Sequence, residues 1–343
     1  MIPQCGNDIS SDNAALTVGT NDVTRSISGI TFEDFCEIYF RDKGPRLKDS
    51  TWAFKKTIIE SKLVPYFGEM LIADIDPQTI MKWQNVMISS RDSKGKAYSP
   101  DYLRDLHAQL SAIFNHAVRY YDLGRNPASV VGTFDKGAPR EVRYWTKEEY
   151  FKFARQMRRD PVYFCAFEML YWTGMREGEL LALTPADFDF DDRTVTITKT
   201  YHRINGEDVI TTPKTTKSNR TITLPLFLCK EIEKYMHRLR RNYDIKINIL
   251  GTDNWENSRL FTMSSYHLRT ALNKGADRAG VKRIRVHDLR HSHVSLLINN
   301  GFSALAIGER VGHEAEKITY RYAHLFTSVQ TEMADMLDAV HAR

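Results

Sequence analysis

The stretch HDLRHSHVSLLINNGFSALAIGERVGHEAEKITYRYAHL, residues 287–325, gathers five histidines, three arginines and two tyrosines. Its first part has apolar residues at helical spacing, and Gly301 is suited to end that helix. His287 and Arg290 are three residues apart, so the pattern predicts that both project from one side of the first helical turn. A second short helix is predicted to end just before His313.

Two simpler interpretations explain part of this stretch. The i, i+4 spacing of His287 and His291 is that of zinc-binding helices, but the glutamate of that motif is missing and no third ligand is evident. A helix-turn-helix DNA reader explains the leucines and the Asn-Gly turn. It does not explain why two arginines, two histidines and a tyrosine gather so closely.

Two other stretches carry basic residues at places that need an explanation. In YWTGMREGELLAL, residues 171–183, an apolar helix is predicted to stop at Gly174, and Arg176 follows at once. A buried arginine needs an anionic partner, and Glu177 or Glu179 is the ordinary choice. In TTPKTTKSNRTITLP, residues 211–225, three cations surround a turn between two strands: Lys214, Lys217 and Arg220.

Composition sets the broad class. The chain has 343 residues, 42% hydrophobic and 27% charged, which is globular and enough for two domains. A net charge of +5 is a mild excess, so affinity for nucleic acid must come from local clustering. No segment reaches the ~18–20 apolar residues of a membrane span, and no signal peptide is evident. Cys165 and Cys229 lie in apolar runs, which indicates reduced, buried thiols and a cytoplasmic protein.

The pattern of the chain predicts a multi-domain, mainly α protein. Residues 1–27 are polar and are predicted to be a tail. Residues 28–131 have helical periodicity throughout and predict an all-helical domain. The segment 132–144 combines glycines, a proline and mixed charge, as a linker does. Residues 145–326 predict an α+β domain, in which period-two alternation indicates a small antiparallel sheet of about three strands. An amphipathic helix is predicted over 327–343.

Four motifs in order carry a family resemblance: TGMREGELLAL, PKTTKSNRTITLP, HDLRHSHVSLLINNG and ERVGHEAEKITYRYAHL. Together they resemble the tyrosine recombinase family, the phage-type and conjugative-transposon integrases, over nearly all of residues 145–326. Residues 28–131 resemble the helical core-binding (SAM-like) domain of that family. The resemblance implies the DNA breaking-rejoining fold, and a site-specific recombinase that integrates or excises a mobile element through a 3′-phosphotyrosine intermediate. The family's small N-terminal arm-binding domain has no counterpart in residues 1–27.

The same resemblance implies the roles of individual residues. Arg176 and Arg290 correspond to the two catalytic arginines, supported by Glu179. His287, His313 and Tyr322 correspond to the base, a further phosphate ligand and the nucleophile. Lys214 corresponds to the general acid, with Lys217 as a competitor. Each step exchanges one phosphoester for another, so neither a metal nor another cofactor is expected.

The implied partners are double-stranded attachment or crossover sites and a homotetramer assembled on them, in the bacterial nucleoid. The resemblance leaves room for accessory DNA-bending or excision factors, and for docking of the C-terminal helix on its own domain or on a neighbouring subunit. No membrane partner is expected. A DNA-binding regulator with an inactive site and a type IB topoisomerase are the alternatives. Basic residues flanking the linker and the predicted hairpin are candidate DNA contacts: Lys48, Lys55, Lys56, Lys94, Lys96, Arg104, Lys136, Arg140, Arg143, Lys217 and Arg220.

Overall fold

The computed structural model describes residues 27–137, 142–204, 206–212, 218–250, 254–312 and 328–341. Several residues singled out from the sequence lie outside these ranges: Arg140, Lys214, Lys217, His313 and Tyr322, together with 1–26 of the predicted tail. The chain divides into two compact units, Met1–Pro139 and Arg140–Arg343. Each unit has its own hydrophobic core.

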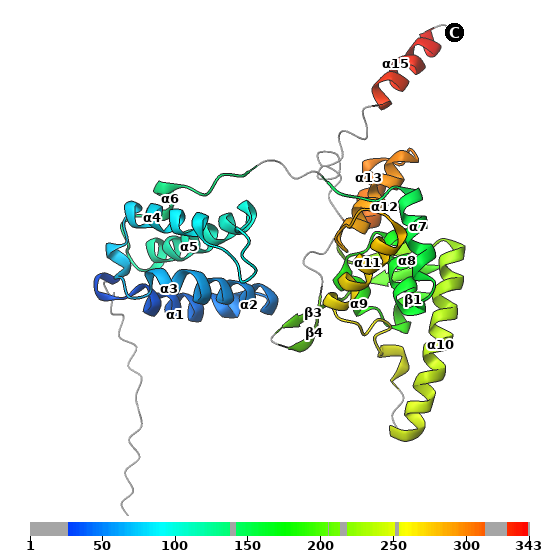
Figure 1. Cartoon of the computed structure of the whole chain (residues 1–343), viewed down its shortest axis with the longest axis horizontal. Helices are drawn as coiled ribbons and strands as arrows, with labels where there is room; N and C mark the ends of the chain where they lie inside the picture. The colour runs from blue at the N-terminus through cyan, green and yellow to red at the C-terminus, as the bar shows by residue number, and fades with distance from the viewer. Residues whose placement is uncertain are drawn as a thin grey trace, which may run out of the picture. The chain divides into compact units, whose positions relative to one another are not determined.

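The N-terminal unit is a bundle of helices (Figure 1). Its α-helices are α1 (Phe32–Lys43), α2 (Asp49–Ile58), α3 (Val64–Phe67), α4 (Pro77–Ser89), α5 (Pro100–Tyr120) and α6 (Pro127–Val131). A π-helical turn, Ile59–Leu63, joins α2 to α3. Helix α1 begins where the Thr31 hydroxyl accepts a hydrogen bond from the backbone N–H of Asp34 at 3.1 Å. Proline is the first residue of α4, α5 and α6, where its missing N–H costs no hydrogen bond.

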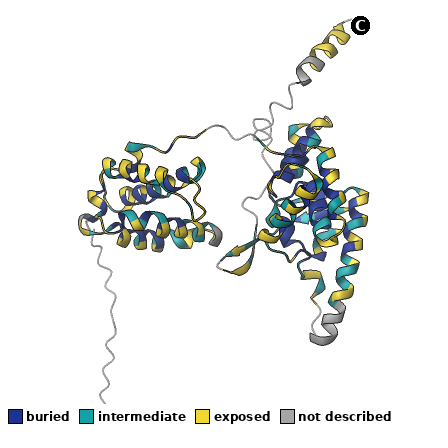
Figure 2. Cartoon of the chain, in the orientation of Figure 1, coloured by how far each residue is buried: buried dark blue, intermediate teal, exposed yellow. Residues whose placement is uncertain are grey.

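The C-terminal unit is mainly helical. Its α-helices are α7 (Lys147–Met157), α8 (Pro161–Thr173), α9 (Glu177–Ala182), α10 (Leu226–Leu250), α11 (Ser265–Ala279), α12 (Asp288–Asn299), α13 (Ala304–Val311) and α15 (Ser328–His341). Helix α8 is apolar on most sides and buries most of its residues, so it forms the centre of the core (Figure 2). Cys165 and Cys229 are buried free thiols. No helix of the described part of the chain is long and apolar enough to cross a bilayer.

The strands form two sheets, where the sequence predicted one. Strands β1 (Phe188–Asp189), β2 (Thr194–Ile197) and β5 (Arg220–Thr223) make an antiparallel sheet in the order β1-β2-β5. Strands β3 (Thr200–Ile204) and β4 (Glu207–Thr211) make a separate hairpin. A small three-stranded antiparallel sheet is present, as predicted. The separate β3–β4 hairpin was not predicted, because the alternation of polar and apolar residues continues through both sheets and does not mark the point where pairing changes.

Two glycines allow the elements around Arg176 to approach closely. Gly174 ends α8 with φ of +67°, and a Cβ there would lie 2.6 Å from the His293 ring. Gly178 in α9 faces β3, and a Cβ there would lie 2.6 Å from the Thr200 hydroxyl oxygen. Since both distances are below any normal carbon contact, larger residues would push α12 or β3 away from the α8–α9 junction.

Candidate active site

Arg176 lies at the start of α9, as the sequence predicted, with Glu179 as its anionic partner. Its Nη1 donates to the Glu179 Oε1 at 2.7 Å, and its backbone N–H donates to Oε2 at 2.8 Å. Its Nη2 donates to the backbone oxygen of Gly312 at 3.4 Å. The Arg176 side chain is 34% exposed, so part of the guanidinium faces solvent. Its orientation is set by the Glu179 carboxylate and the Gly312 carbonyl.

Arg290 reaches the same place from α12. Its Nη1 donates to the carbonyl of Gly174 at 2.6 Å and its Nη2 to the carbonyl of Val311 at 2.5 Å. Val311 and Gly312 belong to adjacent peptide units, so Arg176 and Arg290 meet at the C-terminal end of α13. That end directly precedes His313. The structure therefore brings together two arginines that are 114 positions apart in the sequence (290 − 176 = 114).

His287 stands at the start of α12, one helical turn from Arg290, and is exposed. Its ring lies perpendicular to that of His291, with centroids 5.1 Å apart. Partial desolvation of the ring, followed by the charge of Arg290, lowers the pKa of His287 below its ordinary value. A neutral imidazole at neutral pH is able to accept a proton.

Glu179 is 2% exposed and faces two guanidiniums. Besides Arg176, Arg220 donates to both of its oxygens, from Nη2 at 2.8 Å and from Nη1 at 3.2 Å. Burial alone would raise the pKa of the Glu179 carboxyl, but the hydrogen bonds and charges of Arg220 and Arg176 hold it below its ordinary value. Glu179 is therefore an ionised carboxylate shared by two arginines.

The placement of Arg220 argues against the DNA contact expected from its sequence position. Its side chain is 6% exposed, and its guanidinium bonds the Glu179 carboxylate and the carbonyls of Ser218 and Arg310. A signal for this was present in the sequence. Arg220 is two residues before Ile222, and alternate residues of a strand share a face. Because Ile222 is buried, Arg220 points inward as well.

The candidate DNA contacts of the N-terminal unit differ in how far they are exposed. Lys48 and Lys136 are exposed. Lys94 and Lys96 are exposed on a tight turn, where the Asp92 carboxylate accepts both of their backbone N–H groups.

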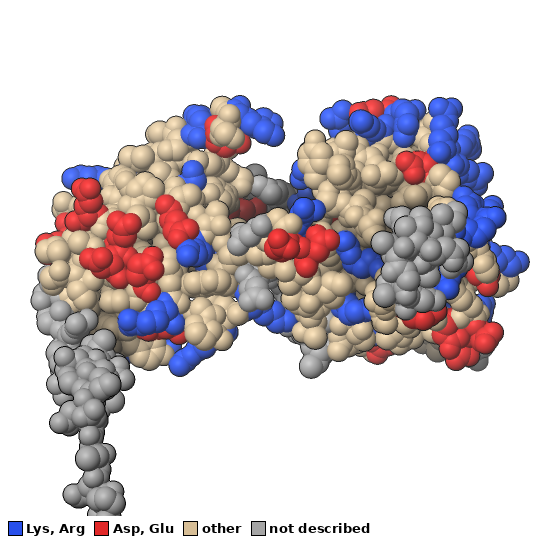
Figure 3. Space-filling model, turned by 90° about the horizontal axis from the view of Figure 1, so that it is seen from below, with Lys and Arg blue, Asp and Glu red and all other residues tan. Residues whose placement is uncertain are grey.

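Three further cations of this unit already have partners. Lys55 is half-buried and donates to Gln109. The exposed Lys56 pairs with Glu60, and Arg104 pairs with Asp101. Among these candidates, the turn of Lys94 and Lys96 presents two exposed cations close together in the sequence. On the face drawn in Figure 3, acidic side chains gather on the N-terminal unit and basic ones line an edge of the C-terminal unit.

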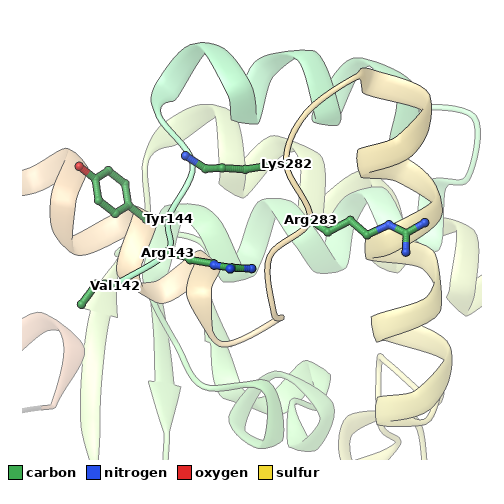
Figure 4. Close-up of a pocket in the computed structure, with 5 residues that line it drawn as sticks. All are labelled: Val142, Arg143, Tyr144, Lys282 and Arg283. Carbon is green, nitrogen blue, oxygen red and sulfur yellow. The ribbon is translucent and has the colours of Figure 1, made fainter. Parts of the chain in front are cut away.

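Arg143 lines a basic cavity of about 540 Å³ in the C-terminal unit, together with Val142, Tyr144, Lys282 and Arg283 (Figure 4). The Lys282 ammonium lies 5.8 Å from the Tyr144 ring centroid and 3.3 Å from a Glu149 oxygen.

Arg283 forms an ion pair with Asp277 at 2.6 Å. Arg143 is exposed and has no acidic partner among the described residues, so its guanidinium can offer paired donors to an anion.

The geometry defines a class of protein. Two convergent guanidiniums beside a neutral imidazole suit a phosphate group on which negative charge develops. With a helical unit and a mixed α+β unit in one chain, this is the arrangement of an enzyme that breaks and rejoins DNA.

Comparisons with known proteins agree. The phage integrase family profile matches residues 145–328, and the N-terminal SAM-like domain of phage integrases matches residues 31–88. The chain is 29% identical over 324 residues to the ICEBs1 integrase of Bacillus subtilis (strain 168), covering 92% of this chain and 84% of that protein.

Solved structures share the fold. The Tn1549 transposon integrase in complex with a circular intermediate DNA superposes with a TM-score of 0.67 at 21% identity, over 88% of this chain and 99% of that one. A lambda integrase tetramer bound to a Holliday junction gives 0.59 at 17% identity, over 84% of this chain and 79% of that one.

The chain belongs to the phage integrase family. It is a tyrosine-type site-specific DNA recombinase that integrates a mobile element, and DNA is its partner.

Proposed function

We propose that Arg176, Glu179, Lys214, His287, Arg290, His313 and Tyr322 form the strand-cleavage site of this recombinase. The observation that carries the proposal is the meeting of Arg176 and Arg290 at the end of α13, one residue before His313. Both guanidiniums, with His313, would donate to the non-bridging oxygens of one phosphate. These donors stay charged at any working pH, and losing one such donor costs about 100–1000-fold in rate.

Proton transfer completes the step. The Tyr322 oxygen attacks phosphorus while the bond from phosphorus to the 5′ oxygen breaks, giving a 3′-phosphotyrosine ester and a free 5′ hydroxyl. A phenol has a pKa of about 10, so it needs a base or a strongly cationic pocket. His287, with its lowered pKa, accepts the phenolic proton. Lys214, or Lys217 in its place, gives a proton to the leaving 5′ oxygen.

We further propose a clamp of two domains on DNA, with residues 28–131 and 145–326 joined by the linker 132–144. The working unit is a homotetramer on paired crossover sites in the bacterial nucleoid, with accessory bending or excision factors. In α15 the side chains of Met333, Met336, Leu337 and Val340 are about half exposed or more, at 48–66%. A helix with this apolar face gains stability by docking, and we propose that it docks on a neighbouring subunit.

The first prediction concerns the nucleophile. A DNA duplex nicked close to the cleavage point traps the covalent adduct, because the released fragment diffuses away before religation. Incubated with EDTA, the wild-type chain should form an adduct that maps to Tyr322 by peptide mass spectrometry. Tyr322→Phe should abolish the adduct while DNA binding persists, since only the phenol oxygen is lost.

Tyr320→Phe is the matched control, because Tyr320 lies two residues away, and it should still form the adduct. Mapping of the adduct to Tyr320 would refute the assignment, as would a requirement for divalent ions. Loss of supercoils from a plasmid without exchange between paired attachment sites would favour a topoisomerase. Binding without any adduct would favour a regulator.

The second prediction concerns the basic cavity. Arg143→Gln should weaken DNA binding and reduce the slope of log K against log salt by about 0.9, the value for one phosphate contact. Fluorescence anisotropy at several salt concentrations measures both quantities. Arg241→Gln, an exposed arginine of α10, serves as the control and should change neither. An unchanged salt slope for Arg143→Gln would show that this side chain does not contact a DNA phosphate.

A further inference from the structure

Arg220 is held more tightly than a surface cation. Its Nη1 and Nη2 donate to the two oxygens of Glu179, Nη1 also donates to the carbonyl of Ser218, and Nε donates to the carbonyl of Arg310 at 3.0 Å. All three nitrogens are engaged, and the side chain is 6% exposed. With four of its five N–H donors engaged and its side chain buried, this guanidinium is poorly placed to reach a DNA phosphate.

The end of α13 receives three guanidiniums on three consecutive carbonyls. Arg220 Nε donates to the carbonyl of residue 310, Arg290 Nη2 to that of 311, and Arg176 Nη2 to that of 312. The last carbonyls of a helix have no partner within the helix and carry partial negative charge, so cations are favoured there. The peptide that precedes His313 is thereby fixed by residues from α9, α12 and β5.

Arg220 is also the first residue of β5, which pairs with β2 through the register Ile197↔Arg220. In the sequence it follows Lys214 and Lys217 by six and three residues. The Arg220 side chain thus contacts the carboxylate that orients Arg176 and the end of α13 that leads to His313. Its backbone begins the strand that follows Lys214 and Lys217 in the sequence.

We propose that Arg220 is a positioning residue of the cleavage site, which acts through Glu179 on Arg176 and through α13 on His313. This rests on the proposed roles of Arg176 and His313. Without Arg220, Glu179 would keep one cationic partner, and both Arg176 and the end of α13 would lose a fixed neighbour. A displacement of about 1 Å in a catalytic group costs on the order of 100-fold in rate, and we expect a loss of up to that size.

The test separates positioning from DNA binding and from packing. Single-turnover cleavage of the nicked duplex at saturating DNA gives the cleavage rate, and anisotropy gives the dissociation constant. Arg220→Gln should lower the cleavage rate by about 10–100-fold and leave the dissociation constant and salt slope unchanged. Arg220→Lys keeps a charge beside Glu179 but cannot bond Glu179 and the Arg310 carbonyl together, so its rate should be intermediate.

Arg259→Gln is the matched control. Arg259 is likewise largely buried, pairs with Asp208 at 2.6 Å, and donates to the carbonyl of Leu181 at the far end of α9. It should also lower the thermal midpoint, though by less than Arg220→Gln does because Asp208 is 45% exposed, and it should have a much smaller effect on cleavage. Equal cleavage rates in the two variants would overturn the proposal, because packing alone would then explain the loss.

The pH profile of cleavage gives a readout that packing does not move. The charged groups that face Glu179 are Arg176 from α9 and Arg220 from β5. Burial raises the pKa of Glu179, and Arg220 and Arg176 lower it. Removing Arg220 therefore raises this pKa, and the acid limb of the rate profile moves to higher pH. Arg259→Gln should leave that limb in place.

Other outcomes are equally decisive. A raised dissociation constant with a reduced salt slope for Arg220→Gln would show a DNA contact and overturn the inference. If that variant does not fold, Arg220→Lys decides, and a wild-type rate for it would overturn the inference. Failure of the wild-type chain to form any adduct at Tyr322 would instead refute the proposed site, so the two failures are distinguishable.

Discussion

Arg290→Gln is expected to lower the rate of strand cleavage by about 1000-fold, at the upper end of the range for losing one preorganised donor. The effect is large because Arg290 has two roles in the structure. It would bind the phosphate, and its Nη1 and Nη2 also hold the carbonyls of Gly174 and Val311. Glutamine cannot reach both carbonyls while facing a phosphate. Single-turnover cleavage of the nicked duplex at saturating DNA measures the effect.

Two comparisons support the interpretation of that result. Arg290→Lys keeps the charge but loses the paired donors, so it should recover only a small part of the rate. DNA affinity should change little in both variants, because it is the sum of many phosphate contacts and each variant alters only one of them. A cleavage rate within about tenfold of wild type for Arg290→Gln would contradict the role proposed here, since one lost donor should cost about 100-fold at least.

Glu179→Gln is expected to destabilise the protein by about 3 kcal/mol, because removing one partner of a buried ion pair leaves a buried charge uncompensated. Arg220 dominates this cost with its 6% exposed side chain. Arg176 contributes less, since at 34% exposure solvent screens its charge. Cleavage should fall as well, because Arg176 loses the carboxylate that orients it. Urea unfolding followed by circular dichroism measures the stability.

The pH dependence of unfolding gives a second test of Glu179. Its pKa is lowered in the folded protein, so its ionised form stabilises the fold at pH above the ordinary value of about 4.5. That stabilisation is lost as the pH falls through the lowered folded value. Glu179→Gln should flatten this acid dependence. Glu60→Gln, from an exposed ion pair on α2 and the following turn, should leave stability near the wild-type value, and equal losses in both variants would contradict a special role for Glu179.

The sequence predicted where Arg176, Glu179 and Arg290 lie in their helices, for a physical reason. Gly174 before Arg176, and the three-residue spacing of His287 and Arg290, are local features that fix which way these side chains leave the backbone. Glu179 as the partner of Arg176 follows from i, i+3 spacing on one helix, and the structure places it there. Which far element completes the site depends on tertiary packing, which no local pattern encodes.

The burial of Arg220 was not predicted from the sequence. A basic residue beside a turn with two lysines is expected at the surface, where it is a candidate DNA contact, because charged side chains at turns are usually solvated. Arg220 and Ile222 are alternate residues of one strand, so the Arg220 side chain shares the inward face of Ile222. A buried arginine is nevertheless not expected until its carboxylate partner is known. That partner lies 41 positions earlier (220 − 179 = 41). The separation of the β3–β4 hairpin from the main sheet was missed for the same reason, since β2 pairs with β5 across the intervening hairpin.

The acceptors at the end of α13 are peptide oxygens, and this has a consequence for which changes the chain can tolerate. A peptide oxygen is present whatever side chain its residue bears, but the end of α13 is also held by the Arg310 side chain, which donates to the carbonyls of Thr223 and Trp172, and by the buried Val311. Gly312 adds a left-handed backbone with φ of +68°. Adding or deleting a single residue within α13 rotates the helix end by about 100° and misaligns every one of these oxygens together. The length of α13 is therefore a constraint that acts on all three of these contacts together.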